Sequence, residues 1–110
     1  MVGVSSPFGS STRTRSLIAL RLLEESYPRE LARLLEQRLY SIQRSLASLE
    51  RDGLVSARPR GRTRLYRLEP RYFARSELAA YLDRLAAQEA DLDARIRSMR
   101  LRPRRTGKRA

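Results

Sequence analysis

The hydrophobic residues recur at helical spacing over the first third of the chain. Leucines at steps of three follow one face of the stretch 12–25, and a second, shorter pattern covers 28–36. The second pattern opens with Pro28, and proline is well placed in the first turn of a helix. Two amphipathic helices are therefore predicted, with core-facing residues Leu17, Leu20, Leu23, Leu31, Leu34 and Leu35.

A third helix is predicted over residues 40–51. Its apolar residues, Leu39, Ile42, Leu46 and Leu49, fall at relative positions 0, 3, 7 and 10. At ~100° per residue they form one stripe. Asp52 and Gly53 end this helix, because glycine readily adopts the left-handed conformation of a C-terminal cap. The side chains away from the apolar stripe are Tyr40, Ser41, Gln43, Arg44, Ser48 and Arg51.

Two short strands are predicted after this helix, over 54–58 and 64–68. They flank the segment 59–62, whose Pro59 and Gly61 indicate a turn, and Pro70 ends the second strand. The pair forms a hairpin with an arginine at every second position near its tip. These are Arg58, Arg60, Arg62 and Arg64.

A long last helix is predicted over residues 75–99. Its apolar residues follow spacings of 4, 3, 7, 4 and 3, a coiled-coil-like seam in which Glu89 is the polar interruption. A helix of this length exceeds what one small core covers, which favours a dimer over packing within one chain. The predicted dimer-interface residues are Leu78, Leu82, Leu85, Leu92, Ile96 and Met99.

The charge of the chain is strongly positive and unevenly distributed. The 110 residues form one small domain with a net charge of +12, and every basic residue except Lys108 is arginine. Residues 58–71 carry +5 and residues 100–110 carry +6, whereas 75–99 carry −1. This segregation indicates a polyanionic partner, since arginine binds phosphate and guanine in bidentate fashion. A GC-rich genome is the alternative reason for arginine itself.

Several function classes are disfavoured by what the sequence lacks. Cysteine and histidine are absent, so no disulfide, thiolate or imidazole metal site is expected, and no cofactor. The glycines are scattered, so no glycine-rich phosphate-binding loop is present. Asp91 and Asp93 point ~200° apart on a helix and cannot act as a pair of carboxylates in one site, so catalysis is not expected. There is no apolar run of ~18 residues and no secretory signal, which favours a cytoplasmic protein without membrane contact.

The segment 12–70 resembles the winged helix-turn-helix of the ArsR/MarR-like transcriptional regulators, and is closest to the ArsR type. The resemblance rests on Glu30-Leu31-Ala32, on Leu46 to Leu49, on Asp52-Gly53-Leu54-Val55 and on Gly61 to Pro70. Two departures stand out. Glu36 and Gln37 occupy a turn that usually holds glycine and leucine, and the metal-binding cysteines and histidines of metal-sensing members are missing.

The expected fold is α+β, mainly helical: a winged helix-turn-helix with a two-stranded wing and a C-terminal dimerisation helix. Residues 1–11 form a flexible arm, 12–74 the DNA-binding domain, 75–99 the dimerisation helix and 100–110 a basic disordered tail. The resemblance implies that the third helix enters the major groove while the wing touches backbone or minor groove. The implied contacts are Tyr40, Ser41, Gln43, Arg44, Ser48, Arg51, Arg58, Arg60, Arg62 and Arg64.

Each implied contact also has a plainer interpretation. Gln43 and Arg44 could be ordinary surface residues, Tyr40 could pack on the preceding helix, and the wing arginines could form a solvated strand face. Base contact is favoured for Gln43 and Arg44, and phosphate or sugar contact for the two serines.

Three functions follow. The leading hypothesis is a homodimeric, sequence-specific regulator of a bacterium or archaeon that binds double-stranded DNA. The second is an interaction module for a partner protein, because the chain also resembles small winged-helix proteins found beside minimal nucleotidyltransferases. The third is a nonspecific architectural nucleic-acid binder driven by the tail.

Overall fold

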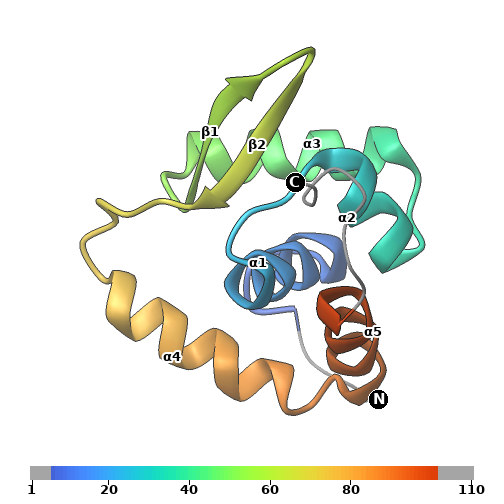
Figure 1. Cartoon of the computed structure of the whole chain (residues 1–110). Coiled ribbons are helices and arrows are strands. Elements are labelled where there is room, and N and C mark those ends of the chain that lie inside the picture. Colours follow the sequence, from blue (N-terminus) through green and yellow to red (C-terminus); the bar gives the residue numbers. More distant parts are fainter. Residues whose placement is uncertain (1–5, 102–110) are drawn as a thin grey trace.

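The computed structural model describes residues 6–101 and the side chains of residues 6–99. Within this part the chain forms five helices and one two-stranded sheet, a mainly helical α+β fold (Figure 1). The elements in chain order are α1 (Ser11–Leu23), α2 (Pro28–Leu35), α3 (Leu39–Arg51), β1 (Val55–Arg60), β2 (Thr63–Leu68), α4 (Arg75–Ala86) and α5 (Ala90–Leu101).

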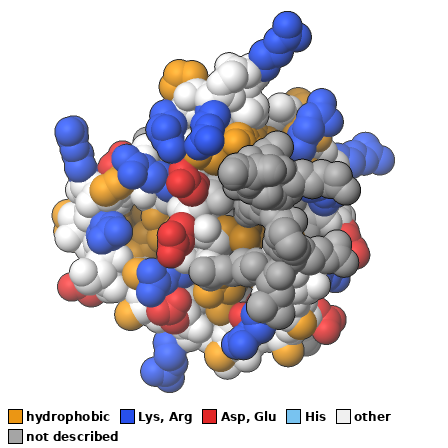
Figure 2. Space-filling model, viewed as in Figure 1, with side chains coloured by type: hydrophobic (Ala, Val, Ile, Leu, Met, Phe, Trp, Pro, Cys, Tyr) orange, Lys and Arg blue, Asp and Glu red, His pale blue; other side chains and the backbone are white. Residues whose placement is uncertain are grey.

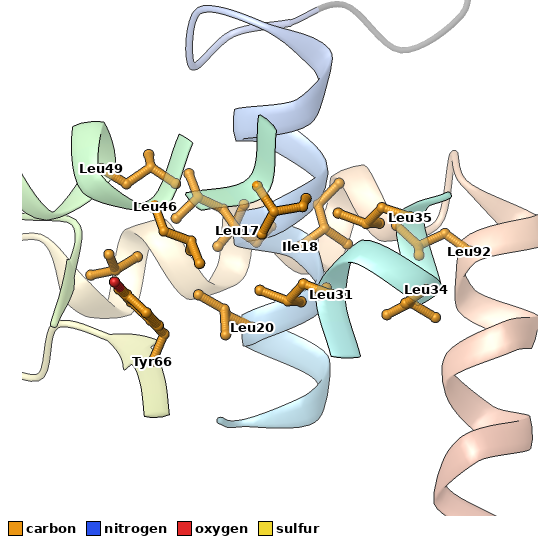
Figure 3. Close-up of a cluster of buried hydrophobic side chains, with 14 of the residues drawn as sticks. Leu17, Ile18, Leu20, Leu31, Leu34, Leu35, Leu46, Leu49, Tyr66 and Leu92 are labelled. Atoms are coloured by element: carbon orange, nitrogen blue, oxygen red, sulfur yellow. The ribbon is translucent and has the colours of Figure 1, made fainter. Parts of the chain in front are cut away.

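Helix α1 is the centre of the molecule. The run from Leu17 to Leu20 has at most 1% of its surface exposed, because α2, α3, α4, α5 and β2 all pack around it. Its leucines meet Leu31 of α2 and Leu46 of α3 in one continuous core (Figure 3). The core-facing leucines predicted from the sequence are buried, except that Leu23 is only partly so.

The last residues of the predicted arm form the turn and the cap that precede α1. Residues 6–10 form a turn in which Gly9 N–H donates to the Ser6 carbonyl over 3.0 Å. Ser10 caps the helix, its hydroxyl accepting from Arg13 N–H at 3.1 Å, and α1 therefore begins at Ser11. The rest of the predicted arm, and the tail from residue 102, lie outside the described residues.

The wing is longer than the sequence predicted, with β1 and β2 closing on the pair Arg60–Thr63. The turn is therefore only Gly61-Arg62, with Gly61 at φ +64°, and Pro59 lies within β1 opposite Arg64. Antiparallel pairs alternate between hydrogen-bonded and non-bonded types. Both backbone hydrogen-bonding groups of Tyr66 pair with another segment, so the pair Ala57–Tyr66 is of the non-bonded type. Pro59 lies two pairs further along, in a pair of the same type, where no backbone N–H has to be donated to β2.

That other segment is the loop between α1 and α2. Ser26 N–H donates to the Tyr66 carbonyl at 3.0 Å, and Tyr66 N–H donates to the Ser26 carbonyl at 2.8 Å. The base of the wing is thus paired on both sides, with β1 on one and Ser26 on the other. The Ser26 hydroxyl also donates to the Glu30 carboxylate at 2.6 Å, which ties this bridge to the first turn of α2.

The prediction of one helix over 75–99 is wrong. The chain breaks at residues 87–89, and α4 and α5 fold onto the side of α1 that faces away from the wing (Figure 1). Glu89 stands at the break, where its carbonyl accepts from Asp93 N–H and its carboxylate pairs with Arg15 at 3.2 Å. The polar interruption of the predicted seam is therefore the junction between two helices.

The predicted seam residues mostly pack inside their own chain. Leu78 and Leu82 of α4 and Leu92 and Ile96 of α5 are buried, and Leu92 lies beside Leu34 and Leu35 of α2 (Figure 3). Leu85 and Met99 are partly buried against the same core. The break lets both halves reach one core, so the premise that the segment is too long for that core does not hold.

Candidate nucleic-acid interface

Helix α3 presents a continuous exposed face on the side away from the core. Ile42, Leu46 and Leu49 are fully buried, and the residues on the opposite side are Tyr40, Gln43, Arg44, Ala47 and Arg51. Tyr40 is 67% exposed, and the Arg44 guanidinium lies 5.7 Å from the centre of its ring. Tyr40 is therefore mostly exposed, and its ring lies against Arg44 on the outer surface of α3.

The turn that leads into α3 explains the departure from the family pattern. Glu36 ends α2 in the left-handed conformation, at φ 56° and ψ 47°, which is the conformation that glycine adopts most readily. Gln37 N–H then donates to the Ala32 carbonyl at 3.0 Å. The turn keeps its short geometry without glycine, and α3 begins at Leu39.

One flank of α3 is lined by serines. Ser41 and Ser48 were predicted from the sequence, and Ser45 completes the row although sequence reasoning missed it. Spacings of four and three residues signal such a row on a helix. Ser48 already has a partner, because its hydroxyl accepts a hydrogen bond from Arg13.

Arg13 is the second residue that sequence reasoning missed. Its guanidinium donates to the Phe8 carbonyl, to Ser48 and, at 2.8 Å, to the Asp52 carboxylate. Its side chain is only 18% exposed. The contacts span up to 39 positions along the chain, so no local signal could have found them. Arg13 joins the start of α1 to the C-terminal half of α3.

The four wing arginines fall into two pairs with different environments. At the base, Arg58 pairs with Glu25 at 3.3 Å, and Arg64 pairs with Glu50 of α3 at 3.2 Å. At the tip, neither Arg60 nor Arg62 pairs with any acidic residue in 6–99. The ion pairs at the base of the wing join it to the α1–α2 loop through Glu25 and to α3 through Glu50. Basic side chains project from the wing's part of the surface (Figure 2).

The aromatic residue behind the wing is held neutral. Burial raises the pKa of the Tyr66 phenol, an effect that the nearby Arg64 partly offsets. The Arg64 guanidinium lies 5.6 Å from the Tyr66 ring centre. Tyr66 is thus a packing residue of the wing with no titration near neutral pH.

The described part of the chain shows neither a metal-binding cluster nor a membrane-spanning helix. Over residues 6–101, no cluster of three or more histidine, cysteine, aspartate or glutamate residues is arranged to hold a metal ion. Nor does any helix in this range have the length and apolar character needed to cross a membrane.

The fold matches solved structures of DNA-regulatory proteins. A ZitR variant from Lactococcus lactis matches with a TM-score of 0.61 at 14% identity, over 90% of this chain and 66% of ZitR. Wild-type ZitR in complex with DNA matches with a TM-score of 0.58 at 11% identity, over 90% of this chain and 68% of ZitR. The chain thus spans about two thirds of ZitR, and at these identities the likeness shows the fold.

A third match is closer in sequence. Reduced HlyU from Vibrio cholerae is 33% identical over 66% of this chain and 72% of HlyU, with a TM-score of 0.51. No protein-family model and no curated protein matches the sequence. Since one third of the aligned residues are shared across more than two thirds of HlyU, the chain belongs to the same family of winged-helix transcriptional regulators.

Proposed function

We propose that the protein binds double-stranded DNA in a sequence-specific manner, with α3 in the major groove and the wing on the backbone or minor groove. The observation that carries this proposal is the set of unpaired arginines on the two adjacent elements. Arg44 and Arg51 of α3 and Arg60 and Arg62 of the wing form no ion pair with any acidic side chain in 6–99.

The side chains on the exposed face suit base recognition. Arginine donates in bidentate fashion to guanine O6 and N7, and glutamine pairs with adenine N6 and N7. Arg44 and Gln43 supply both chemistries. Arg51 lies two turns beyond Arg44 on the same face and is placed for the backbone at the groove edge.

The wing supplies contacts that are independent of sequence. Each arginine that neutralises a phosphate releases counterions, so its contribution to affinity falls as salt rises. Arg60 and Arg62 are placed to do this, with Arg58 and Arg64 as further contacts if their ion pairs exchange for phosphate. ZitR, a protein of the same fold, is solved in complex with DNA, which supports DNA binding by this fold.

We also propose that the regulator acts as a homodimer of the ArsR-like type. A single protomer reads only a few base pairs, and helix-turn-helix proteins gain affinity by occupying two half-sites. Among the six predicted interface residues, Leu85 and Met99 are only partly buried. Sedimentation of the intact protein should give twice the protomer mass, and Leu85→Glu should lower it, provided that circular dichroism shows a retained fold.

A role in holding a partner protein is the second candidate. It is favoured by Phe73, which is 92% exposed in the loop between the wing and α4, and lies 5.1 Å from the Tyr72 ring. Tyr72 is partly buried against the core, so Phe73 is the exposed ring, and aromatic residues are enriched at protein interfaces. Co-purification of Phe73→Ala and intact protein with the products of neighbouring genes would test it.

The decisive experiment for DNA recognition compares two variants on two duplexes. The preferred duplex is first selected from a random library with intact protein. Arg44→Ala should cost about 1–3 kcal/mol on that duplex and little on a random one. Arg62→Ala should weaken both alike and make the salt slope shallower by about one. Equal losses for Arg44→Ala would favour nonspecific binding, and no duplex binding by the intact protein would leave the protein-partner role.

A further inference from the structure

A cleft of about 310 Å³ lies between the start of α1 and the serine flank of α3. It opens to solvent and borders the exposed face of α3 at Arg44. Five of its seven lining residues carry hydroxyl groups, and the other two are arginines. The hydroxyl groups come from Ser10 and Thr12 at the start of α1 and from Ser41, Ser45 and Ser48 of α3.

The walls of the cleft are held in place by Arg13. Its guanidinium bonds to Ser48 and Asp52 on α3, while its backbone N–H donates to the Ser10 hydroxyl. The α1 wall and the α3 wall therefore keep a fixed separation. Ser41 and Ser45 lie one turn apart on α3, and their hydroxyl groups have no hydrogen-bond partner among the described residues.

The chemistry of the lining is that of an anion site. No carboxylate lines the cleft, and Asp52, which lies close to it, is occupied by Arg13. Hydroxyl and guanidinium groups are the donors that proteins most often place on DNA phosphates. An open cleft lined in this way suits one group of a passing polymer rather than an enclosed small molecule.

We propose that this cleft binds one phosphodiester of the DNA backbone, beside the base pairs that α3 reads. The inference rests on the proposed DNA binding and adds a specific contact to it. A phosphate held by Ser41, Ser45 and Thr12 sets the depth and register of α3, so that Arg44 reaches its base from a fixed distance. Arg44 borders both the cleft and the exposed face, so substituting it would remove a base contact and a phosphate contact together. The test therefore substitutes the serines.

The first test is the double variant Ser41→Ala with Ser45→Ala. Alanine is the better helix former, so the fold is retained, and thermal unfolding verifies this. Loss of two uncharged donors should weaken binding about tenfold on the preferred duplex and less on a random one, where Arg44 has no base to reach, with an unchanged salt slope. Ser76→Ala, an exposed serine of α4, is the matched control and should bind as the intact protein does.

The second test locates the phosphate. Methylphosphonate is substituted at each backbone position of the preferred duplex in turn, which removes one charge at a time. At one position per half-site, the substitution should weaken the intact protein but not the double variant. If every position weakens both proteins equally, or if the double variant binds as tightly as the intact protein, the cleft is not a phosphate site.

Inorganic phosphate separates the backbone from a free anion. Titrated into the protein without DNA, it should bind only in the millimolar range, and micromolar binding lost in the double variant would assign the cleft to a free anion instead. The two proposals also fail differently. An intact protein that binds no duplex overturns both, whereas intact binding that the serine variant retains overturns the cleft alone.

Discussion

The arginines of the two halves of the molecule differ in how often they pair with an acidic side chain. In the supporting half, formed by α1, α4 and α5, five of the seven arginines in 6–99 pair within the chain, among them Arg15 with Glu89, Arg21 with Asp83 and Arg97 with Asp93, whereas Arg75 and Arg84 of α4 do not. On α3 and the wing tip, Arg44, Arg51, Arg60 and Arg62 pair with no acidic residue of 6–99. The difference teaches that composition alone does not mark a binding surface, and that the share of arginines left without an acidic partner separates the two regions better.

The largest expected effect is on the core of the supporting half. Leu82 of α4 is fully buried, so Leu82→Ala leaves a cavity and should lower the free energy of unfolding by about 2–5 kcal/mol. The partly buried Leu85→Ala should cost less. Denaturant titration measures both. Since Leu82 is buried in its own chain and α4 carries no proposed DNA contact, the folded fraction of Leu82→Ala should keep its DNA affinity, and a specific loss there would bring α4 into the DNA interface.

Arg13 links the two halves and should give the next largest effect. Arg13→Met keeps the aliphatic stem but removes three hydrogen bonds, and a loss of about 1–3 kcal/mol of stability is expected. Arg15→Met removes the ion pair of a more exposed arginine, 44% exposed, whose only acidic partner in 6–99 is Glu89, and it should cost less. If thermal or denaturant unfolding gave the same loss of stability for both variants, Arg13 would stabilise the fold no more than an ordinary surface ion pair does.

A substitution at the wing tip can give Arg60 an acidic partner, as most arginines of the supporting half have. Thr63 stands opposite Arg60, so Thr63→Glu places a carboxylate across from that arginine. The salt slope of DNA binding should become shallower by about one, since one phosphate contact is lost. Thr63→Gln, similar in size but uncharged, should leave the salt slope unchanged. If the salt slope of Thr63→Gln became shallower by the same amount, the cause would be the shape of the wing and not the new charge.

The smallest effect concerns the pair Arg21–Asp83, whose hydrogen bonds measure 2.9 and 3.0 Å. These bonds hold the pKa of Asp83 below its ordinary value and that of Arg21 above. Asp83 therefore stabilises the fold above the pKa of the unfolded chain, and this is lost as the pH falls through the folded value. Asp83→Asn should cost under about 1 kcal/mol at pH 7 and nothing in strong acid. Unfolding curves that differ equally at both pH values would contradict this.

The Asp83→Asn variant also tests the comparison itself. The substitution removes the ion-pair partner of Arg21, which lies on α1 and not on α3 or the wing. If position matters as well as pairing, DNA affinity at moderate salt should stay within about twofold of the intact protein, because a distant charge is screened. A large gain in affinity would show that total charge dominates.

Local patterns predicted much of the fold. The apolar stripe of α3, the left-handed Gly53 that follows it and the paired strands are written in neighbouring residues, and each is found within a few positions of its expected place. Gln43 and Arg44 could likewise be placed on the exposed face from their angle to Leu46.

The rest depended on contacts between distant segments. Nothing between residues 75 and 99 resembles a helix breaker, since no glycine or proline occurs there. The break at Glu89 follows from its pair with Arg15 and from the burial of Leu92 on α2, which are tertiary effects. The same holds for Arg13, whose role exists only once α1 lies against α3.

The bridge between Ser26 and Tyr66 has a consequence for amide hydrogen exchange. Both amide protons lie inside hydrogen bonds at the base of the wing, between the α1–α2 loop and β2. The tip at Gly61 and Arg62 has no such second neighbour in the described chain. Exchange should therefore be slow at the base and fast at the tip, and DNA that holds the wing should slow exchange chiefly at the tip.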